Sequence, residues 1–333
     1  MSQRIIESNP SKETFRLGSF IKSIFQAREA GMIAFLFTLV LIIGLVNPVF
    51  LQVDNMMNIF RSTSFIFIIG IAMTFVLISA GLDLSIAPVF ALGGIIASLA
   101  VVNGIPSFFC ILLGIAVGLV VGLANGILIV KFKIPALIVT LGMMYMIRGV
   151  VLVITQGLSI FPLTPEFAAL GQGSFLGVPY VIWIAVILAI IAHYVLTQTA
   201  YGREVLAVGG NEETSRLAGI NTGRVKMSVY VLCSMAAAFS GTIMAARLNS
   251  GQPSVGTGYE LIVIAAVIIG GTSLFGGAGS ILGTASGALL TTVITNGMVA
   301  MKISPYWQNL VVGAIIILAV GVDQFRRRKS GLN

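Results

Sequence analysis

Long runs of Ile, Val, Leu, Ala and Phe, separated by short polar gaps, dominate this chain of 333 residues. A helix needs about 20 apolar residues to cross the hydrocarbon core of a bilayer, and the runs come close to that length or exceed it. The pattern therefore predicts ten transmembrane helices. The ten runs cover residues 31–51, 59–80, 85–103, 105–130, 134–155, 178–196, 229–248, 259–274, 281–301 and 306–322.

Two stretches of small and polar residues interrupt this pattern at comparable places in the two halves of the chain. They read "SAGLDLSIAP" (79–88) and "GGTSLFGGAGS" (270–280). Lipid cannot hydrogen-bond the backbone groups that such breaks expose, so the breaks should lie in protein or line a water-filled cavity. Paired Gly-broken segments indicate an internal repeat and a solute path. Two tight turns between helices remain the alternative, and the pattern leaves open whether the segments near 85 and 275 span the membrane fully.

The longest polar stretch between the chain ends, "YGREVLAVGGNEETSRLAGINTGRVK" (201–226), lies between two apolar runs. Its second half predicts a short helix over 212–218, because Asn211 is a good N-cap and Gly219 suits the position after the C-cap. An isolated helix of two turns is only marginally stable in water. We therefore expect this helix to dock on another surface; the alternative is a solvated loop that contains a capped turn.

The composition explains why the polar gaps are so short. Hydrophobic residues make up 57% of the chain and charged residues 9%, whereas an ordinary soluble domain carries roughly 25% charged residues. So little charge cannot cover a core of this size with polar surface, and the fold class is an all-α, polytopic membrane protein. The net charge of +8 does not indicate a nucleic-acid partner, because the basic residues sit at the chain ends and between the runs rather than on one soluble face.

The basic residues also predict the orientation of the chain. Ten spans place both termini, the gap at 131–133 and the polar stretch on the same side of the membrane. These regions hold five, four, two and four basic residues, which is 15 of the 19 in the chain. Basic residues favour the cytoplasmic side, so we expect both termini there. The predicted parts are a cytoplasmic segment at 1–30, either an interfacial helix or a tail, a transmembrane domain at 31–323 with a cytoplasmic loop at 197–228, and a basic tail at 324–333.

The sequence offers little catalytic chemistry. His193 is the single histidine and lies near the end of a run, and Cys110 and Cys233 lie inside runs, where cysteine is typically a small buried residue. The chain has no H-E-x-x-H, no C-x-x-C and no phosphate-binding loop of the G-x-x-x-x-G-K-[ST] type. We therefore expect no enzyme activity, no metal site and no cofactor in this chain.

Polar side chains inside the runs are few, and a charge at mid-bilayer normally faces protein or water. Arg148 lies deep in a run, whereas no Asp or Glu clearly does, which argues against an ion-coupled carrier. A hydrogen bond to a neighbouring helix is the alternative role for such side chains. The candidates for a solute path are Asp83, Ser85, Asn125, Arg148, Ser273 and Asn296.

Four motifs resemble the permease subunits of ribose-type ABC sugar importers, a branch of the branched-chain and monosaccharide permease family. In chain order they are "ISAGLDLSIAPVFALGG", "YGREVLAVGGNEETSRLAGIN", "GTGYELIVIAAVIIGGTSLFGGAGSILGT" and "PYWQNLVVGAIIILAVGVD". The likeness runs over residues 45–323. One departure is that many relatives continue "GLDLS" with Val-Gly-Ser, whereas this chain has Ile86, Ala87 and Pro88, and a proline stiffens the backbone.

The resemblance implies a helical bundle of about ten spans in the bacterial inner membrane. It also implies a second permease copy in a homodimer, an ATP-binding cassette subunit that carries the ATP, and a periplasmic sugar-binding protein. It assigns the polar stretch to the surface that fits a cleft of the ATPase. The residues concerned are Gly202, Arg203, Asn211, Glu212, Glu213, Arg216, Leu217, Gly219 and Ile220.

The expected function is ATP-driven import of a monosaccharide, a ribose-like pentose or a related sugar, by alternating access. Another small polar solute, such as a furanose signal molecule or a polyol, remains open within the same architecture. An ion-coupled secondary carrier is the rival from another class. The sequence leaves open which sugar is carried and whether the two permease copies are identical.

Overall fold

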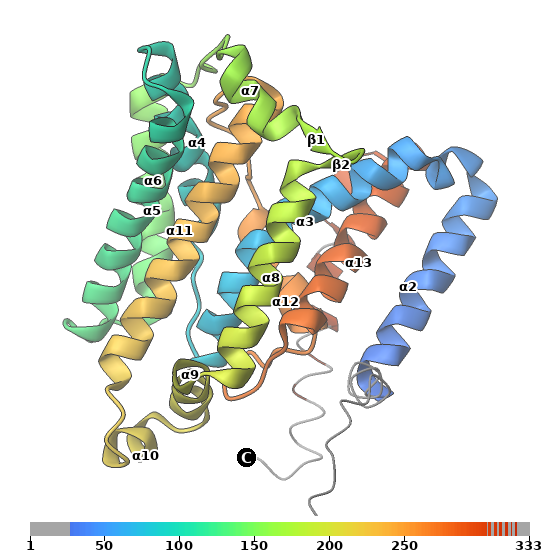
Figure 1. Cartoon of the computed structure of the whole chain (residues 1–333). Coiled ribbons are helices and arrows are strands. Elements are labelled where there is room, and N and C mark those ends of the chain that lie inside the picture. Colours follow the sequence, from blue (N-terminus) through green and yellow to red (C-terminus); the bar gives the residue numbers. More distant parts are fainter. Residues whose placement is uncertain are drawn as a thin grey trace, which may run out of the picture.

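The computed structural model describes residues 27–304 and scattered positions between 306 and 324. The described part is a bundle of helices that run between two ends (Figure 1). The predicted segment at 1–26 and the basic tail from 325 lie outside the described residues. The tenth run, 306–322, falls where only single positions are described.

Nine of the ten predicted runs form helices in the described part of the chain. Six of these helices are long and apolar enough to cross a membrane: α3 (Val53–Ile78), α5 (Ser107–Val130), α6 (Ala136–Thr155), α8 (Tyr180–Gln198), α11 (Thr222–Leu248) and α13 (Ile281–Ala300). The other three are α2 (Ala27–Val46), α4 (Ile86–Val102) and α12 (Tyr259–Ile269).

Short elements cover the two ends of the bundle. One end carries the 3₁₀ helix η1 (Pro48–Leu51), α7 (Pro165–Gln172) and a hairpin of β1 (Ser174–Phe175) and β2 (Val178–Pro179), in which Ser174 pairs with Pro179. The opposite end carries α9 (Ala200–Gly210) and α10 (Glu212–Leu217). The first turn of α2 lies at the same end as α9 and α10 (Figure 1).

Helix α11 lies at the centre of the bundle and packs against α3, α4 and α5. Close approach to α5 depends on glycines spaced four residues apart, which share one helix face. A Cβ built on Gly122 would lie 2.5 Å from Cα of Val231, and one built on Gly118 would overlap the carbonyl oxygen of Ser234. The glycine repeat of α5 is therefore a packing surface of the small-xxx-small type.

The two Gly-broken stretches separate helices rather than forming whole spans. Residues 79–85 connect α3 to α4, and Pro88 lies in the first turn of α4, where a proline removes no intrahelical hydrogen bond. The departure from the "GLDLS" pattern is therefore compatible with a regular helix start.

Helix α12 is shorter than the run at 259–274 predicts. Its 11 residues rise about 16 Å, which is roughly half of a hydrocarbon core of about 30 Å. The helix ends at Ile269 because Gly270 and the positive φ of 95° at Gly271 turn the chain into the loop 270–280. This run is therefore a half-span followed by a loop.

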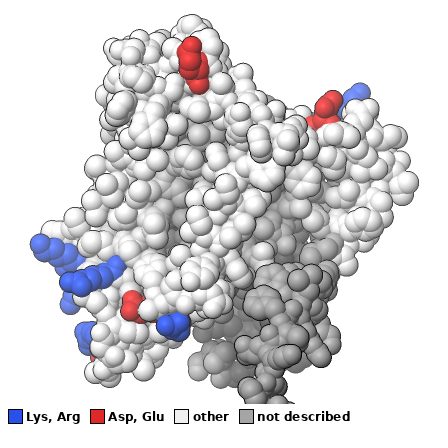
Figure 2. Space-filling view, in the orientation of Figure 1, with Lys and Arg blue, Asp and Glu red and all other residues white. Residues whose placement is uncertain are grey.

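Charged side chains are concentrated at the end that carries α9 and α10. Figure 2 shows most of the visible Lys and Arg side chains gathered there. Six basic residues lie in or between the elements of this end: Lys131 and Lys133 between α5 and α6, Arg203, Arg216, Arg224 and Lys226.

Candidate functional site

The polar stretch at 201–226 folds into two short helices and the first turn of α11. The first of them, α9, is a helix that the sequence analysis did not predict. The Thr199 side chain caps it by accepting a hydrogen bond from Gly202 N at 3.2 Å. Val205 and Val208, three residues apart, are buried, whereas Arg203 is exposed. This amphipathic spacing is the signal that could have revealed α9.

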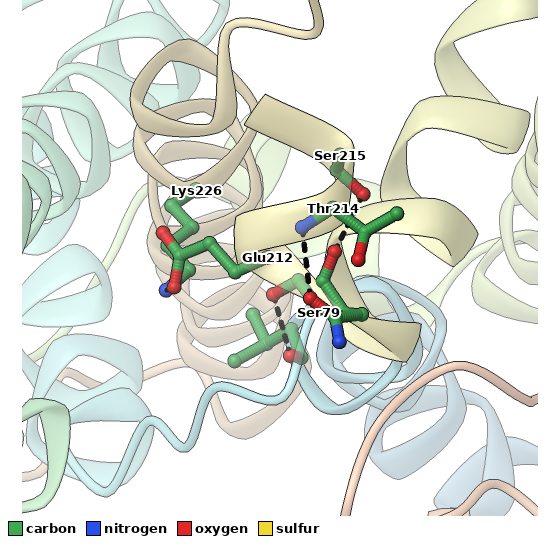
Figure 3. Close-up of polar contacts among 7 residues, drawn as sticks. Ser79, Glu212, Thr214, Ser215 and Lys226 are labelled. Atoms are coloured by element: carbon green, nitrogen blue, oxygen red, sulfur yellow. Dashed lines mark hydrogen bonds and ion pairs between the residues drawn. The ribbon is translucent and has the colours of Figure 1, made fainter. Parts of the chain in front are cut away.

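Helix α10 confirms the predicted caps and ends one residue earlier than predicted. Asn211 has an extended backbone (φ −160°), and its side-chain oxygen accepts from Thr214 N at 2.8 Å (Figure 3). At the other end Gly219 has φ +86°. Its N–H donates to Arg216 O, and Ile220 N donates to Ser215 O, both at 3.0 Å. These two bonds form a Schellman motif.

The outward face of α10 is polar except for one large apolar side chain. Glu212, Glu213 and Arg216 are exposed, and Leu217 is 81% exposed. A single exposed leucine is common on protein surfaces, so Leu217 by itself identifies no contact. Two of the residues that the resemblance assigns to the docking surface do not lie on this outward face. Gly202 is buried against α8, and Ile220 packs against the hydrophobic core of the bundle.

One ion pair joins α10 to the bundle, and a second lies within α10. Glu212 pairs with Lys226 of α11, whose side chain is only 25% exposed, and Arg216 pairs with Glu213 within α10 at 2.6 Å. Exposed pairs of this kind contribute about 0.2–1 kcal/mol each. In Figure 3 the Glu212 and Lys226 side chains face each other beside the cap of α10. Helix α10 is thus fixed to α9 and α11 but leaves Leu217 uncovered by the described residues.

The end of α9 contacts both Gly-broken stretches at one point. A Cβ on Gly209 would overlap the carbonyl oxygen of Ile78, the last residue of α3, and would lie 2.8 Å from Gly277 N. Gly277 N itself donates to Ile78 O at 2.8 Å. The break after α3, the loop 270–280 and the end of α9 are therefore in direct backbone contact, and a movement of α9 must displace both breaks.

A cleft of about 610 Å³ opens between α9, α10 and α11. Its floor includes the hydroxyl of Tyr201, which is hydrogen-bonded to Ser228 Oγ at 2.7 Å. Burial raises the pKa of Tyr201. Glu204 and Arg224 line the cleft with opposite charges, so the cleft suits a polar side chain better than an apolar one.

Three of the predicted path residues lie together in the core. Asp83, Ser85 and Asn125 are fully buried. Ser85 donates to Asp83 Oδ1 from its backbone N at 2.8 Å and from its hydroxyl at 2.6 Å, and Asn125 Nδ2 donates to Ser85 Oγ at 2.9 Å. We call these three residues the Asp83 node. The node joins the break 79–85 to α5.

Comparison with known proteins shows the family of this chain. A family model described as "Branched-chain amino acid transport system / permease component" matches residues 55–320. The chain belongs to this permease family. The match includes both Gly-broken stretches, α9, α10 and the Asp83 node.

Named relatives of the permease cover almost its whole length. It is 39% identical over 320 residues to the ribose import permease protein RbsC of Haemophilus influenzae, covering 95% of this chain and 97% of the relative. It is 40% identical to RbsC of Escherichia coli K12, over 89% and 93% of the two chains. It is 36% identical to the L-arabinose ABC transporter permease protein AraH of Azospirillum brasilense, over 90% and 89%. No solved structure matches the permease.

The other three predicted path residues of the permease make their hydrogen bonds elsewhere. Arg148 donates to Pro253 O at 2.7 Å and so joins α6 to the segment before α12. Asn296 accepts from Asn55 Nδ2 at 3.2 Å, and Ser273 Oγ accepts from Phe275 N at 3.2 Å within its own loop. Of the six residues that the sequence predicted for a solute path, the permease therefore brings three together.

Two positions of the permease that the sequence analysis did not single out join the site. Gly209 permits the contact between α9, α3 and the loop 270–280, and Tyr230 of α11 approaches the break at Leu82, where its hydroxyl accepts from Leu82 N at 3.3 Å. The "GG" before Asn211 was a signal for close backbone approach, whereas the long-range contact of Tyr230 leaves no local pattern.

Proposed function

We propose that this permease is the membrane-spanning subunit of an ATP-driven importer for a monosaccharide, a ribose-like pentose or a related sugar. The observation that carries the proposal is the 39% identity to a ribose import permease over 95% of the chain. Relatives named for ribose and for L-arabinose share an aldopentose as the substrate class.

The chain belongs to a family of transport-system permease components, and we infer that its ATP is bound by a separate cassette ATPase. The docking surface for that ATPase is the exposed face of α10 with its neighbours. Within it Leu217 supplies the apolar contact, and a set of polar residues supplies the rim: Arg203, Asn211, Glu212, Glu213 and Arg216. Gly219 shapes the end of α10, and Gly202 and Ile220 act from inside by holding the two helices on the bundle.

The end that carries α9 and α10 is the cytoplasmic end in this proposal. Its basic residues follow the positive-inside rule, and the start of α2 at the same end supports a cytoplasmic N-terminus. Ten crossings, counting the one made by α12 together with its flanking segments, then return the C-terminus to the same side. The opposite end, with α7 and the β1–β2 hairpin, faces the periplasmic sugar-binding protein. Two identical permease copies complete the membrane part, with the solute path between them.

Mechanical coupling runs through α9. ATP binding on the partner moves α10, and the Glu212–Lys226 pair and the backbone contacts of α9 carry that movement to α11 and α3. Because Gly209 touches Ile78 and Gly277 together, both breaks shift at once. Chain breaks shift more readily than packed helices, so the membrane part can change between outward-facing and inward-facing forms.

Reconstituted uptake tests the function directly. Proteoliposomes that contain the permease, its cognate ATPase and its sugar-binding protein are expected to accumulate radiolabelled ribose or L-arabinose only with ATP. Omitting the ATPase is the control, and competition by a polyol or a furanose measures which solute is preferred. Uptake that a sodium or proton gradient drives without the ATPase would show an ion-coupled carrier and overturn the proposal.

A further inference from the structure

The Asp83 node contains a carboxylate with no positive charge to balance it. Asp83 lies in the connection 79–85 and is fully buried. Both hydrogen bonds that it accepts from Ser85 reach the same oxygen, Oδ1. A buried, ionised carboxylate without a paired charge is costly, because burial removes its hydration. The bonding of the node must therefore include something besides the described side chains.

Two buried oxygens of the node have no hydrogen-bond donor among the described residues. They are Asp83 Oδ2 and Asn125 Oδ1. Buried polar atoms are satisfied in the great majority of cases, so two orphaned acceptors in one node call for a missing donor. Both belong to side chains that share the hydroxyl of Ser85.

Among the described residues, the surroundings of Asp83 supply no such donor. From α11, Tyr230 and Cys233 are the titratable groups that act on Asp83. The Tyr230 hydroxyl lies at the backbone of Leu82, 3.3 Å from N and 3.5 Å from O. From α6, Thr140 also donates to Leu82 O, at 3.3 Å. Helix α5 presents Asn125, whose amide N is already bonded to Ser85.

We propose that the Asp83 node is a proton-binding site and that Asp83 carries the proton on Oδ2 in this conformation. Protonation removes the uncompensated charge and turns Oδ2 from an orphaned acceptor into a donor. Asn125 Oδ1 is the other oxygen of the node that lacks a donor, and both side chains bond the hydroxyl of Ser85. The proton comes from water and returns to water when the break 79–85 opens.

A metal cation fits the node less well than a proton. Ca²⁺ and Mg²⁺ take about six or more oxygen ligands, and the node has two free oxygens. The described residues contain no group of three or more His, Cys, Asp and Glu side chains that could hold a metal ion. One proton needs one donor position and one acceptor, which matches the count of orphaned atoms.

The test measures the melting temperature of the full-length permease in detergent from pH 4 to 7. A carboxyl that is protonated in the folded state and ionised in the unfolded chain lowers stability as pH rises. We expect the wild-type melting temperature to fall by about 2 °C per pH unit more than that of Asp83→Asn. In Asp83→Asn the amide nitrogen takes the place of Oδ2 and supplies the missing donor without a charge. The amide oxygen takes the place of Oδ1 and still accepts from Ser85.

Matched variants make the outcome decisive. Glu166→Gln removes an exposed carboxylate of α7 and should keep the wild-type pH slope, whereas Asp83→Leu should lower the melting temperature at every pH. An Asp83→Asn variant with the wild-type slope, or one as unstable as Asp83→Leu, would overturn the proposal. So would a rise in the wild-type melting temperature on adding Na⁺, K⁺ or Mg²⁺ that Asp83→Asn does not show. The measurement uses neither sugar nor ATP, so its failure is separate from a failure of the proposed function.

Discussion

Replacing Leu217 with Asp is expected to lower ATP-driven uptake by about 30-fold. Leu217 is 81% exposed in the permease, so the change leaves the isolated fold intact. In the complex it removes an apolar side chain worth about 2 kcal/mol when buried, and each 1.4 kcal/mol is about tenfold in an equilibrium. The measurement is ribose uptake by proteoliposomes with the ATPase, together with co-purification of the ATPase with the permease.

Leu176→Asp is the matched control for this change. Leu176 has the same exposure of 81% but lies in the turn between β1 and β2, at the opposite end of the bundle. It adds the same charge in place of the same side chain, so co-purification of the ATPase should stay close to wild type. Full uptake by the Leu217→Asp permease would place the ATPase on another surface.

Gly209→Ala is expected to abolish coupled transport and to lower the melting temperature of the permease. The added Cβ overlaps the backbone oxygen of Ile78, and a backbone atom cannot swing away as a side chain can. Overpacking of this kind typically costs about 1–3 kcal/mol, and relief requires α9 to move off α3 and the loop 270–280. Uptake in proteoliposomes and the melting temperature in detergent are the two measurements.

Gly210→Ala separates this steric effect from a change in helix propensity. Gly210 is the next residue of α9, and a Cβ there meets no described atom within 4 Å. Both variants favour a helical backbone by a similar amount, so only Gly209→Ala should lose transport. Equal behaviour of the two variants would mean that the contact of α9 with α3 does not transmit movement.

The sequence predicted those features of the fold that depend on local pattern. Apolar runs near 20 residues long identify spans without knowledge of their neighbours, and nine of them form helices in the described part. The caps of α10 were predictable for the same reason, because Asn211 and Gly219 bond within four residues of their own positions. The sequence left open whether the run at 259–274 spans the membrane fully, because an apolar run does not show how far the helix inside it extends; Gly270 ends that helix.

The candidate site was only partly predictable because it is assembled by long-range contacts. Asp83 and Ser85 are neighbours in sequence, but Asn125 reaches them from another helix. Arg148 was a reasonable candidate because a charge within a run needs a partner. Its partner is a backbone carbonyl, Pro253 O. Every residue has a backbone carbonyl, so the sequence cannot show which one accepts the hydrogen bond. Gly209 was missed because a glycine can serve a turn, a cap or a close contact, and only the packing of α9 decides which.

The hydrogen bond from Gly277 N to Ile78 O also sets an order of events during biosynthesis. The end of α3 emerges from the ribosome about 200 residues before its partner, which takes about 10–40 s at 5–20 residues per second. During that interval the last carbonyl of α3 lacks the hydrogen bond from Gly277 N. Helix α9, once it has been made, still lacks its contact with the loop 270–280. The end of the permease that carries α9 and α10 is therefore completed late in translation, after the loop 270–280 has been made.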